Sequence, residues 1–310
     1  MIDFLTYIAS LVIGFLLMIK SADIVTNHAS NISKKRGISE MTIGMTLVAL
    51  ATSLPELAIS STSAFVGKTD IALGNVIGSN ITNVALVLGL CAIIRSISIE
   101  KRVVGSDGAW MLIATFITSA LLYFGDFGRI DGLILLLIFV AFLYFLRKTE
   151  KGNYSGAKTG ESALIDVVWS LGGGVLVWIG SWIAIFGVEG FANYFGIKPI
   201  YIALTIVALG TSLPELIVSI VAITKDLKSI SVGNILGSNI FNLLLVLGIS
   251  SIIRPILVDS SVLSFYVPIM IISSLLCVLF MRTKWTLERW EGFTLLLIYI
   301  AFISLIFKGF

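Results

Sequence analysis

Ten long apolar stretches, separated by short polar loops, constrain this chain more than any other feature of its sequence. They lie near residues 4–28, 40–65, 71–94, 107–124, 130–146, 163–187, 199–223, 230–253, 261–281 and 290–307. Each is close to the length of about 20 apolar residues that a helix needs to cross a bilayer. Charged residues make up only 13% of the 310 residues, about half the fraction in a soluble domain. We therefore predict an all-α membrane protein with ten transmembrane helices, and exclude a soluble enzyme, a nucleic-acid-binding protein and a disordered chain.

The chain also contains an internal duplication. Residues 43–95 align without a gap on residues 202–254, and about half of the positions are identical. The run Ala-Leu-Ala-Thr-Ser-Leu-Pro-Glu-Leu at 49–57 matches Ala-Leu-Gly-Thr-Ser-Leu-Pro-Glu-Leu at 208–216. A second run, Gly-Asn-Val-Ile-Gly-Ser-Asn-Ile-Thr-Asn at 74–83, matches Gly-Asn-Ile-Leu-Gly-Ser-Asn-Ile-Phe-Asn at 233–242. Weaker similarity between 131–138 and 291–298 extends the repeat over nearly both halves.

The number of stretches per repeat predicts how the halves are oriented. Five spans in each half make the second half enter the membrane from the opposite side, so the two five-helix repeats must be inverted copies. We expect the first repeat at 1–146, a flexible cytoplasmic linker at 147–162, rich in Gly, Ser and Lys, and the second repeat at 163–310. With both termini outside, most of the 21 Lys and Arg residues fall in cytoplasmic loops, as the positive-inside rule requires.

Glu56 and Glu215 are the two acidic residues deep within apolar stretches, and they occupy equivalent positions in the two repeats. A charged side chain at mid-membrane costs at least about 2.5–3.5 kcal/mol, and two close carboxylates also repel each other. Lys20 is the only basic residue placed to offset them, and it has no counterpart in the second half. A pair of protonated glutamates is the structural alternative, but the pairing favours a cation site.

The residues around these glutamates supply further oxygen atoms. Pro55 and Pro214 free backbone carbonyls in the preceding turn. Hydroxyl and amide groups come from Thr52, Ser53, Thr211, Ser212, Ser79, Asn80, Asn83, Ser238, Asn239 and Asn242. Hard cations such as Ca²⁺ prefer oxygen ligands. The sequence contains no Cys or His cluster, which argues against zinc, copper or iron.

The two doubled motifs resemble the α-repeats of the cation/calcium antiporter superfamily, and within it the sodium/calcium exchangers of prokaryotic type. The resemblance covers essentially the whole chain and implies that helices 2, 3, 7 and 8 form the central site. It implies Ca²⁺ ligands Glu56, Glu215, Thr52 and Thr211, and Na⁺ ligands from the same glutamates, Ser53, Ser79, Ser212, Ser238 and the carbonyls of Ala49 and Ala208. Asn83 matches the family's central asparagine, and helices 1 and 6 are implied to slide as a gate.

Asn242 departs from this family pattern, because several exchangers carry an aspartate there. Two glutamates then give the site a formal charge of −2, and the missing acid weighs against potassium coupling. The proton/calcium branch typically carries a glutamate within the Gly-Asn-x-x-Gly motif, and neither copy in this chain has one. This absence weighs against a dedicated Ca²⁺/H⁺ exchanger.

We therefore expect a secondary antiporter that exchanges Ca²⁺ for Na⁺ by alternating access. A Ca²⁺ (or other divalent)/H⁺ antiporter is the nearest alternative. A cation channel or an intramembrane enzyme fits less well, because inverted repeats suit alternating access and no nucleophile–base set is visible. We expect no cofactor besides the transported ions, no nucleic-acid partner, a lipid bilayer around a monomer, and a multi-pass location in the cell membrane.

Overall fold

The computed structural model describes residues 2–101, 103–124, 127–153, 162–194, 208–260 and 262–307. This part of the chain is helical apart from two short strands and the connecting loops. The protein is an all-helical membrane protein with the ten-helix, inverted-repeat fold predicted from the sequence. Seven of the described helices, and one bent pair, are long and apolar enough to cross a bilayer.

The elements of the first half follow in chain order. They are α1 (Ile2–Arg36), α2 (Glu40–Ile43), a π-helical segment (Gly44–Val48), α3 (Ala49–Thr52), α4 (Leu54–Phe65), α5 (Thr69–Ile81), a π-helical segment (Thr82–Leu88), α6 (Gly89–Ile94), β1 (Ile97–Ser98), a π-helical segment (Val103–Gly108), α7 (Ala109–Tyr123) and α8 (Arg129–Asn153). α8 continues to Asn153, so the first seven residues of the expected linker, 147–153, are helical.

The described helices of the second half follow a similar order. Its elements are α9 (Leu164–Tyr194), α11 (Ala208–Thr211), α12 (Leu213–Thr224), α13 (Lys228–Ile240), a π-helical segment (Phe241–Val246), α14 (Leu247–Ile253), a π-helical segment (Val262–Tyr266), α15 (Val267–Arg282), β2 (Thr286–Leu287) and α16 (Arg289–Phe307). The expected linker residues 154–161 and the first part of the seventh span, 199–207, lie outside the described residues. β1 pairs antiparallel with β2, with Ile97 opposite Leu287.

The last helix of each half packs on the third helix of the other half. α8 packs against α14, and α16 packs against α6. Glycines allow these backbones to approach: a Cβ on Gly132 would lie 2.6 Å from the Gly248 carbonyl oxygen, and one on Gly292 would lie 2.6 Å from that of Gly89. The same contact is therefore made twice between the inverted halves.

The acidic residues at 131 and 291, which match in the repeat, cap these last helices. The Asp131 carboxylate accepts a hydrogen bond of 2.8 Å from the Gly128 amide. The Glu291 carboxylate accepts one of 2.7 Å from the Glu288 amide. A side chain that bonds an amide three residues earlier satisfies a donor that the helix start leaves open. Their duplication therefore serves the fold and not a second charged site.

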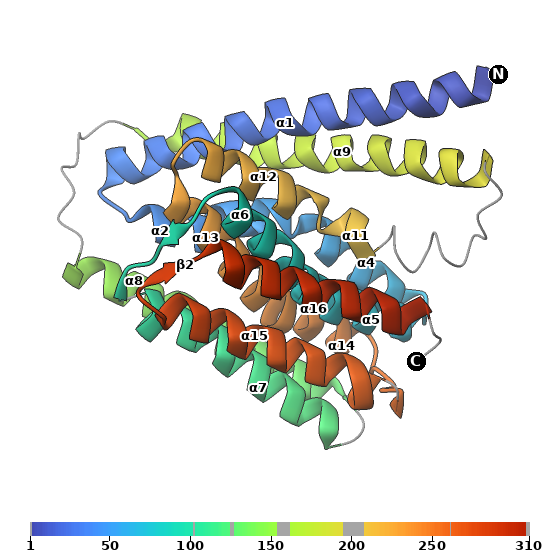
Figure 1. The fold of residues 1–310 in the computed structure, drawn as a ribbon. Coiled ribbons are helices and arrows are strands. Elements are labelled where there is room, and N and C mark those ends of the chain that lie inside the picture. Colours follow the sequence, from blue (N-terminus) through green and yellow to red (C-terminus); the bar gives the residue numbers. More distant parts are fainter. Residues whose placement is uncertain are drawn as a thin grey trace.

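The two longest helices, α1 and α9, lie side by side along one face of the bundle (Figure 1). They extend beyond the expected spans at 4–28 and 163–187. A Cβ on Gly14 would lie 2.7 Å from the carbonyl oxygen of Gly180, so their backbones are in direct contact. At one end the pair is joined by Asp166, which lies 2.7 Å from the His28 Nδ1 and 2.9 Å from the Lys35 Nζ.

Candidate functional site

Two broken helices in equivalent positions form the centre of the molecule. α3 ends at Thr52, and α4 leaves at an angle of 48° to the helix before it. The backbone of the linking residue Ser53 has φ −88° and ψ 6°, and its counterpart Ser212 has φ −89° and ψ 1°. A proline stands near the start of each following helix, where its missing N–H costs nothing. The prolines that the sequence marks, Pro55 and Pro214, therefore stand directly after these two breaks.

Each break places a glutamate in the first turn of the helix that follows it. Glu56 lies at the start of α4 and Glu215 at the start of α12, and both side chains are completely buried. The positive end of a helix dipole favours a carboxylate in its first turn. No described Lys, Arg or His forms an ion pair with either glutamate, so this dipole offsets only part of the charge.

The two carboxylates have different hydrogen-bond partners. The Glu215 Oε1 atom accepts bonds from the hydroxyls of Ser53 at 3.2 Å and Ser238 at 3.3 Å. Among the described residues neither oxygen of Glu56 has a hydrogen-bond partner, and the Ser212 hydroxyl also has none. Unsatisfied buried polar atoms cost about 1–3 kcal/mol each. The Glu215 Oε2 atom also has no partner among the described residues, so both glutamates offer unused oxygen ligands, two on Glu56 and one on Glu215.

The hydroxyl groups of the two halves meet in crossed pairs. Thr52 Oγ1 lies 3.4 Å from Ser238 Oγ, and Thr211 Oγ1 lies 3.3 Å from Ser79 Oγ. Each pair joins the broken helix of one half to the third helix of the other. The structure thus brings the six hydroxyl residues of the expected ligand set into one region with the glutamates. Ser53 and Ser238 bond to Glu215, Thr52 contacts Ser238, Ser79 and Thr211 contact each other, and Ser212 lies at the break before Glu215.

Asn83 and Asn242 are the second residues of the π-helical segments that follow α5 and α13. Both side chains are completely buried, and within the described residues neither amide has a hydrogen-bond partner. Single-turn π-helical segments are frequent at functional sites. An unpartnered buried amide in such a segment is able to offer its carbonyl oxygen to an ion or a water molecule.

The backbone positions expected to contribute are Ala49 and Ala208. The Ala49 carbonyl oxygen accepts a bond of 2.9 Å from the Ser53 amide, and the Thr52 hydroxyl lies 3.3 Å from it. It is therefore already engaged by the bent turn. Ala208 begins α11, and its side chain is outside the described part of the structure.

Four residues next to this cluster were not predicted from the sequence as part of the site. The Asn75 Oδ1 atom accepts a bond of 3.1 Å from the Thr211 hydroxyl, and the Asn75 Nδ2 atom donates to Ser60 at 3.0 Å. The equivalent residues make the same contacts. The Thr52 hydroxyl donates to Asn234 Oδ1 at 3.0 Å, and Asn234 Nδ2 donates to Ser219 at 3.0 Å. The sequence contains a signal for these four residues, because the asparagines and the serines are identical at equivalent positions of the duplication.

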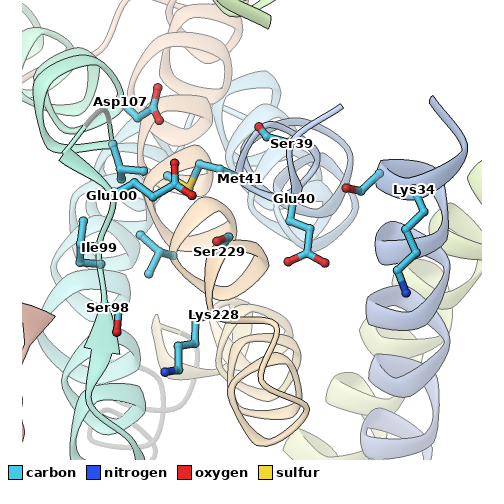
Figure 2. Close-up of a pocket in the computed structure, with 13 residues that line it drawn as sticks. Lys34, Ser39, Glu40, Met41, Ser98, Ile99, Glu100, Asp107, Lys228 and Ser229 are labelled. Carbon is cyan, nitrogen blue, oxygen red and sulfur yellow. The ribbon is translucent and has the colours of Figure 1, made fainter. Parts of the chain in front are cut away.

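Two cavities differ in whether predicted site residues line them. A cavity of about 420 Å³ is lined by ends of α1, α2 and α13 and by the segment after β1, with Glu40, Glu100 and Lys228 among its residues (Figure 2). It contains none of the predicted site residues. A smaller cleft of about 100 Å³ is lined by Pro55 and Thr211 together with Trp178 and Trp182 of α9. The small cleft therefore adjoins the carboxylate cluster.

The chemistry of the cluster comes from oxygen atoms alone. Within the part of the chain that the structure describes, no place gathers three or more His, Cys, Asp or Glu side chains. Two carboxylates, hydroxyls and amide carbonyls form the kind of donor set that hard cations prefer. Soft nitrogen and sulfur ligands, which select zinc or copper, are not part of it.

The fold and the comparisons together define the protein as a multi-pass membrane cation antiporter. The chain belongs to the sodium/calcium exchanger family, whose sequence model matches residues 6–148 and 165–308, one segment in each half. It is 32% identical to the sodium/calcium exchanger MaX1 of Methanosarcina acetivorans, over 96% of this chain and 97% of that protein. It is 34% identical to the inner membrane protein YrbG of Escherichia coli, over 86% of each chain. A solved structure of the sodium-calcium exchanger NCX_Mj, soaked with Na⁺ and Sr²⁺, aligns with a TM-score of 0.85 at 30% identity, over 97% of this chain and 98% of that one.

Proposed function

We propose that this protein exchanges Ca²⁺ for Na⁺ across the cell membrane by alternating access at the cluster around Glu56 and Glu215. The observation that carries the proposal is a pair of completely buried carboxylates, on two symmetry-related broken helices, with no ion-pair partner among the described residues. The names of the similar proteins support the choice of ions, because MaX1 is a sodium/calcium exchanger and NCX_Mj was soaked with Na⁺ and Sr²⁺.

Charge balance explains why such a site exchanges ions and does not leak them. Burying an uncompensated carboxylate costs several kcal/mol even after the protein relaxes. One Ca²⁺ neutralises both glutamates, and two Na⁺ do the same. A third Na⁺ leaves a net charge of +1 and makes the cycle electrogenic. The empty site therefore cannot pass through a closed state, and each crossing requires one of the two sets of cations.

The proposed ligands are the residues that the family resemblance implies. Ca²⁺ is held by Glu56, Glu215, Thr52 and Thr211. Na⁺ is held by the same glutamates with Ser53, Ser79, Ser212 and Ser238 and the carbonyls of Ala49 and Ala208, while Asn83 and Asn242 contribute amide oxygens. The crossed hydroxyl contacts between the halves support this assignment, because one ion between the halves touches ligands from both.

The helix pair α1 and α9 is the proposed gate. It packs along one face of the bundle, and its residues Trp178 and Trp182 line the small cleft beside Thr211. A slide of this pair over the site changes which side of the membrane the cleft opens to. With both termini outside and the linker in the cytoplasm, the basic loops face the cytoplasm.

Substitution of the glutamates tests the proposal. Glu56→Gln and Glu215→Gln each keep the shape of the side chain and remove one charge, so we expect Na⁺-dependent ⁴⁵Ca²⁺ uptake into proteoliposomes to be abolished. Asp70→Asn is the matched control, because it removes an exposed acid from the first turn of neighbouring α5 and leaves uptake intact. Wild-type uptake by a Glu56→Gln protein contradicts the proposed site.

A further inference from the structure

The inverted halves contain two equivalent pairs of helices beside the carboxylate cluster, α1 with α12 and α9 with α4. The alignment that relates the two motifs also relates α1 to α9, because the close approach of Gly14 to Gly180 recurs between Gly173 and Ser21 at the equivalent positions. Within the described residues, α1 packs closely against α12, whereas α9 makes no comparable contact with α4. The two long helices are therefore attached differently to the rest of the bundle.

The same difference appears in how the carboxylate cluster is covered. Ile59 of α4 and Ile185 of α9 line the small cleft beside Thr211. The equivalent residues of α12 and α1 are Val218 and Thr26, and both are completely buried. The cluster thus has a cleft beside α9 and closed packing beside α1.

Lys225, the residue after α12, joins α12 to α1 on the closed side. Its Nζ atom lies 2.9 Å from the Asp23 carboxylate, 2.9 Å from the Asn27 Oδ1 atom and 3.4 Å from the Thr26 hydroxyl. An ammonium group has three donors, and all of these acceptors belong to α1. The side chains of Lys225 and Asp23 are only 29% and 39% exposed, so water competes for the contact only in part.

The other half has apolar residues at the positions of this contact. Val66 is the equivalent of Lys225, and Trp182 and Phe186 are the equivalents of Asp23 and Asn27. All three apolar side chains are more than half exposed, so they do not hold α9 on α4. The duplication therefore contains a polar attachment on one side only.

Opening of an approach beside α1 requires α1 to move away from α12. That movement separates Lys225 from its partners, whereas the contact of Asp166 with His28 and Lys35 lies between α1 and α9 and moves with the pair. A contact that exists in only one of two states shifts the equilibrium between them by its own free energy. The Lys225 contact therefore favours the state in which the approach beside α1 is closed.

We propose that Lys225, Asp23 and Asn27 form a latch that holds α1 on α12 and biases the protein toward the state with its cleft beside α9. In the proposed topology this end of α12 faces the cytoplasm, so the latch favours the state open to the outside. The inference rests on the proposed alternating access at the carboxylate cluster. It adds a physical reason for one state to be preferred, which the duplicated motifs alone do not provide.

Cysteines introduced at equivalent positions report on the two approaches. Val218→Cys reports on the closed side and Ile59→Cys on the side of the cleft, and the native cysteines are buried. Lys225→Met keeps the length of the side chain and removes its charge, so it releases the latch. Exchange of the two charges, Lys225→Asp with Asp23→Lys, rebuilds the ion pair and serves as the rescue variant.

Arg95→Gln is the matched control for release of the latch. Arg95 follows α6 and lies 3.3 Å from Asp226, the residue next to Lys225. The variant therefore removes an ion pair from the same turn without changing a contact of α1 or α9.

The measurement is the rate at which a water-soluble maleimide modifies each cysteine in detergent, where both faces of the protein are accessible. We expect Lys225→Met to raise the rate at Val218→Cys about threefold, in line with the strength of a partly exposed ion pair, and to lower the rate at Ile59→Cys. The charge exchange restores both rates, and Arg95→Gln leaves them unchanged. The Tm of Lys225→Met is expected to be close to that of Arg95→Gln.

Three outcomes overturn the inference. An unchanged rate at Val218→Cys in Lys225→Met shows that the contact does not keep the approach closed. Equal increases at both cysteines with a lowered Tm show a general loosening of the protein, and an equal effect of Arg95→Gln shows that any ion pair at this turn suffices. The labelling requires no transport, so a failure of Na⁺-dependent ⁴⁵Ca²⁺ uptake contradicts the proposed function and is distinguishable from a failure of the latch.

Discussion

At the scale of single residues, Asn242 is the position where an acidic residue would add a third negative charge to the proposed site. It is completely buried and its amide has no hydrogen-bond partner within the described residues. Asn242→Asp makes the formal charge of the site more negative, from −2 to −3, so we predict a KM for Ca²⁺ about tenfold lower, because ligand charge tunes Ca²⁺ affinity. We also predict a slower turnover, because the ion leaves less readily. Initial rates of ⁴⁵Ca²⁺ uptake measure both quantities.

Asn83→Asp is the symmetry-related control for this prediction. Asn83 lies at the equivalent position in the π-helical segment of the first half and is equally buried, so the same direction of change is expected. A Ca²⁺ affinity that is unchanged in both variants shows that these amides lie outside the cation site.

The sequence predicts the residues of the candidate site better than the bonds between them. Glu56 and Glu215 are identifiable because a carboxylate within an apolar span is costly and has to be compensated. The bond from Thr211 to Asn75 is not identifiable, because it joins two residues from different halves whose approach depends on the packing of α5 against α11. Identity across the duplication marks such residues as important without stating what they contact.

At the scale of elements, Asp166 joins α9 to α1. Its side chain is 5% exposed and lies 2.7 Å from the His28 Nδ1 and 2.9 Å from the Lys35 Nζ. Hydrogen bonds to charged groups contribute about 1.5–3 kcal/mol each. We predict that Asp166→Asn lowers the Tm measurably and slows exchange, because α1 and α9, the proposed gate helices, then lose a contact that joins them. Thermal unfolding in detergent and transport rates measure the two effects.

Asp226→Asn is the matched control for this prediction. Asp226 lies 3.3 Å from Arg95 with 62% of its side chain exposed, and exposed ion pairs contribute only about 0–1 kcal/mol. Its backbone has a positive φ of 63°, which asparagine tolerates. If Asp226→Asn destabilises the protein as much as Asp166→Asn does, the buried contact has no special role.

Element boundaries were predicted less well than element positions. α1 ends at Arg36 and α8 at Asn153, well beyond the apolar stretches that revealed them. Apolar length reports the part of a helix that lies in lipid, whereas a helix continues into the aqueous phase as long as its backbone bonds and packing allow. The breaks at Ser53 and Ser212 were predictable because a proline marks each of them.

At the scale of the whole molecule, a labelling experiment tests the proposed orientation of the protein in the membrane. The two native cysteines, Cys91 and Cys277, are buried, so a cysteine introduced into the linker is the main reactive thiol. We predict that Ser155→Cys reacts with a membrane-impermeant maleimide in inside-out vesicles and not in intact cells. The reverse pattern places the linker outside and inverts the proposed topology.

The overall fold was predictable because the duplication carries an odd number of spans per half, which dictates inversion. The crossed packing of α8 on α14 and of α16 on α6 follows that inversion. The close pairing of α1 with α9 was not predictable from apolar pattern alone. It depends on glycines such as Gly14 and Gly180, whose partners are distant in the sequence.

The proposed exchange requires that Ca²⁺ uptake be coupled to Na⁺ release, and transport by the reconstituted protein tests this coupling. The wild-type protein is reconstituted into liposomes loaded with Na⁺ or, separately, with choline at symmetric pH, and ⁴⁵Ca²⁺ uptake is followed. We predict uptake that requires the outward Na⁺ gradient and is absent from choline-loaded vesicles. Equal uptake into both contradicts sodium coupling, and an imposed pH gradient then distinguishes proton exchange from a leak.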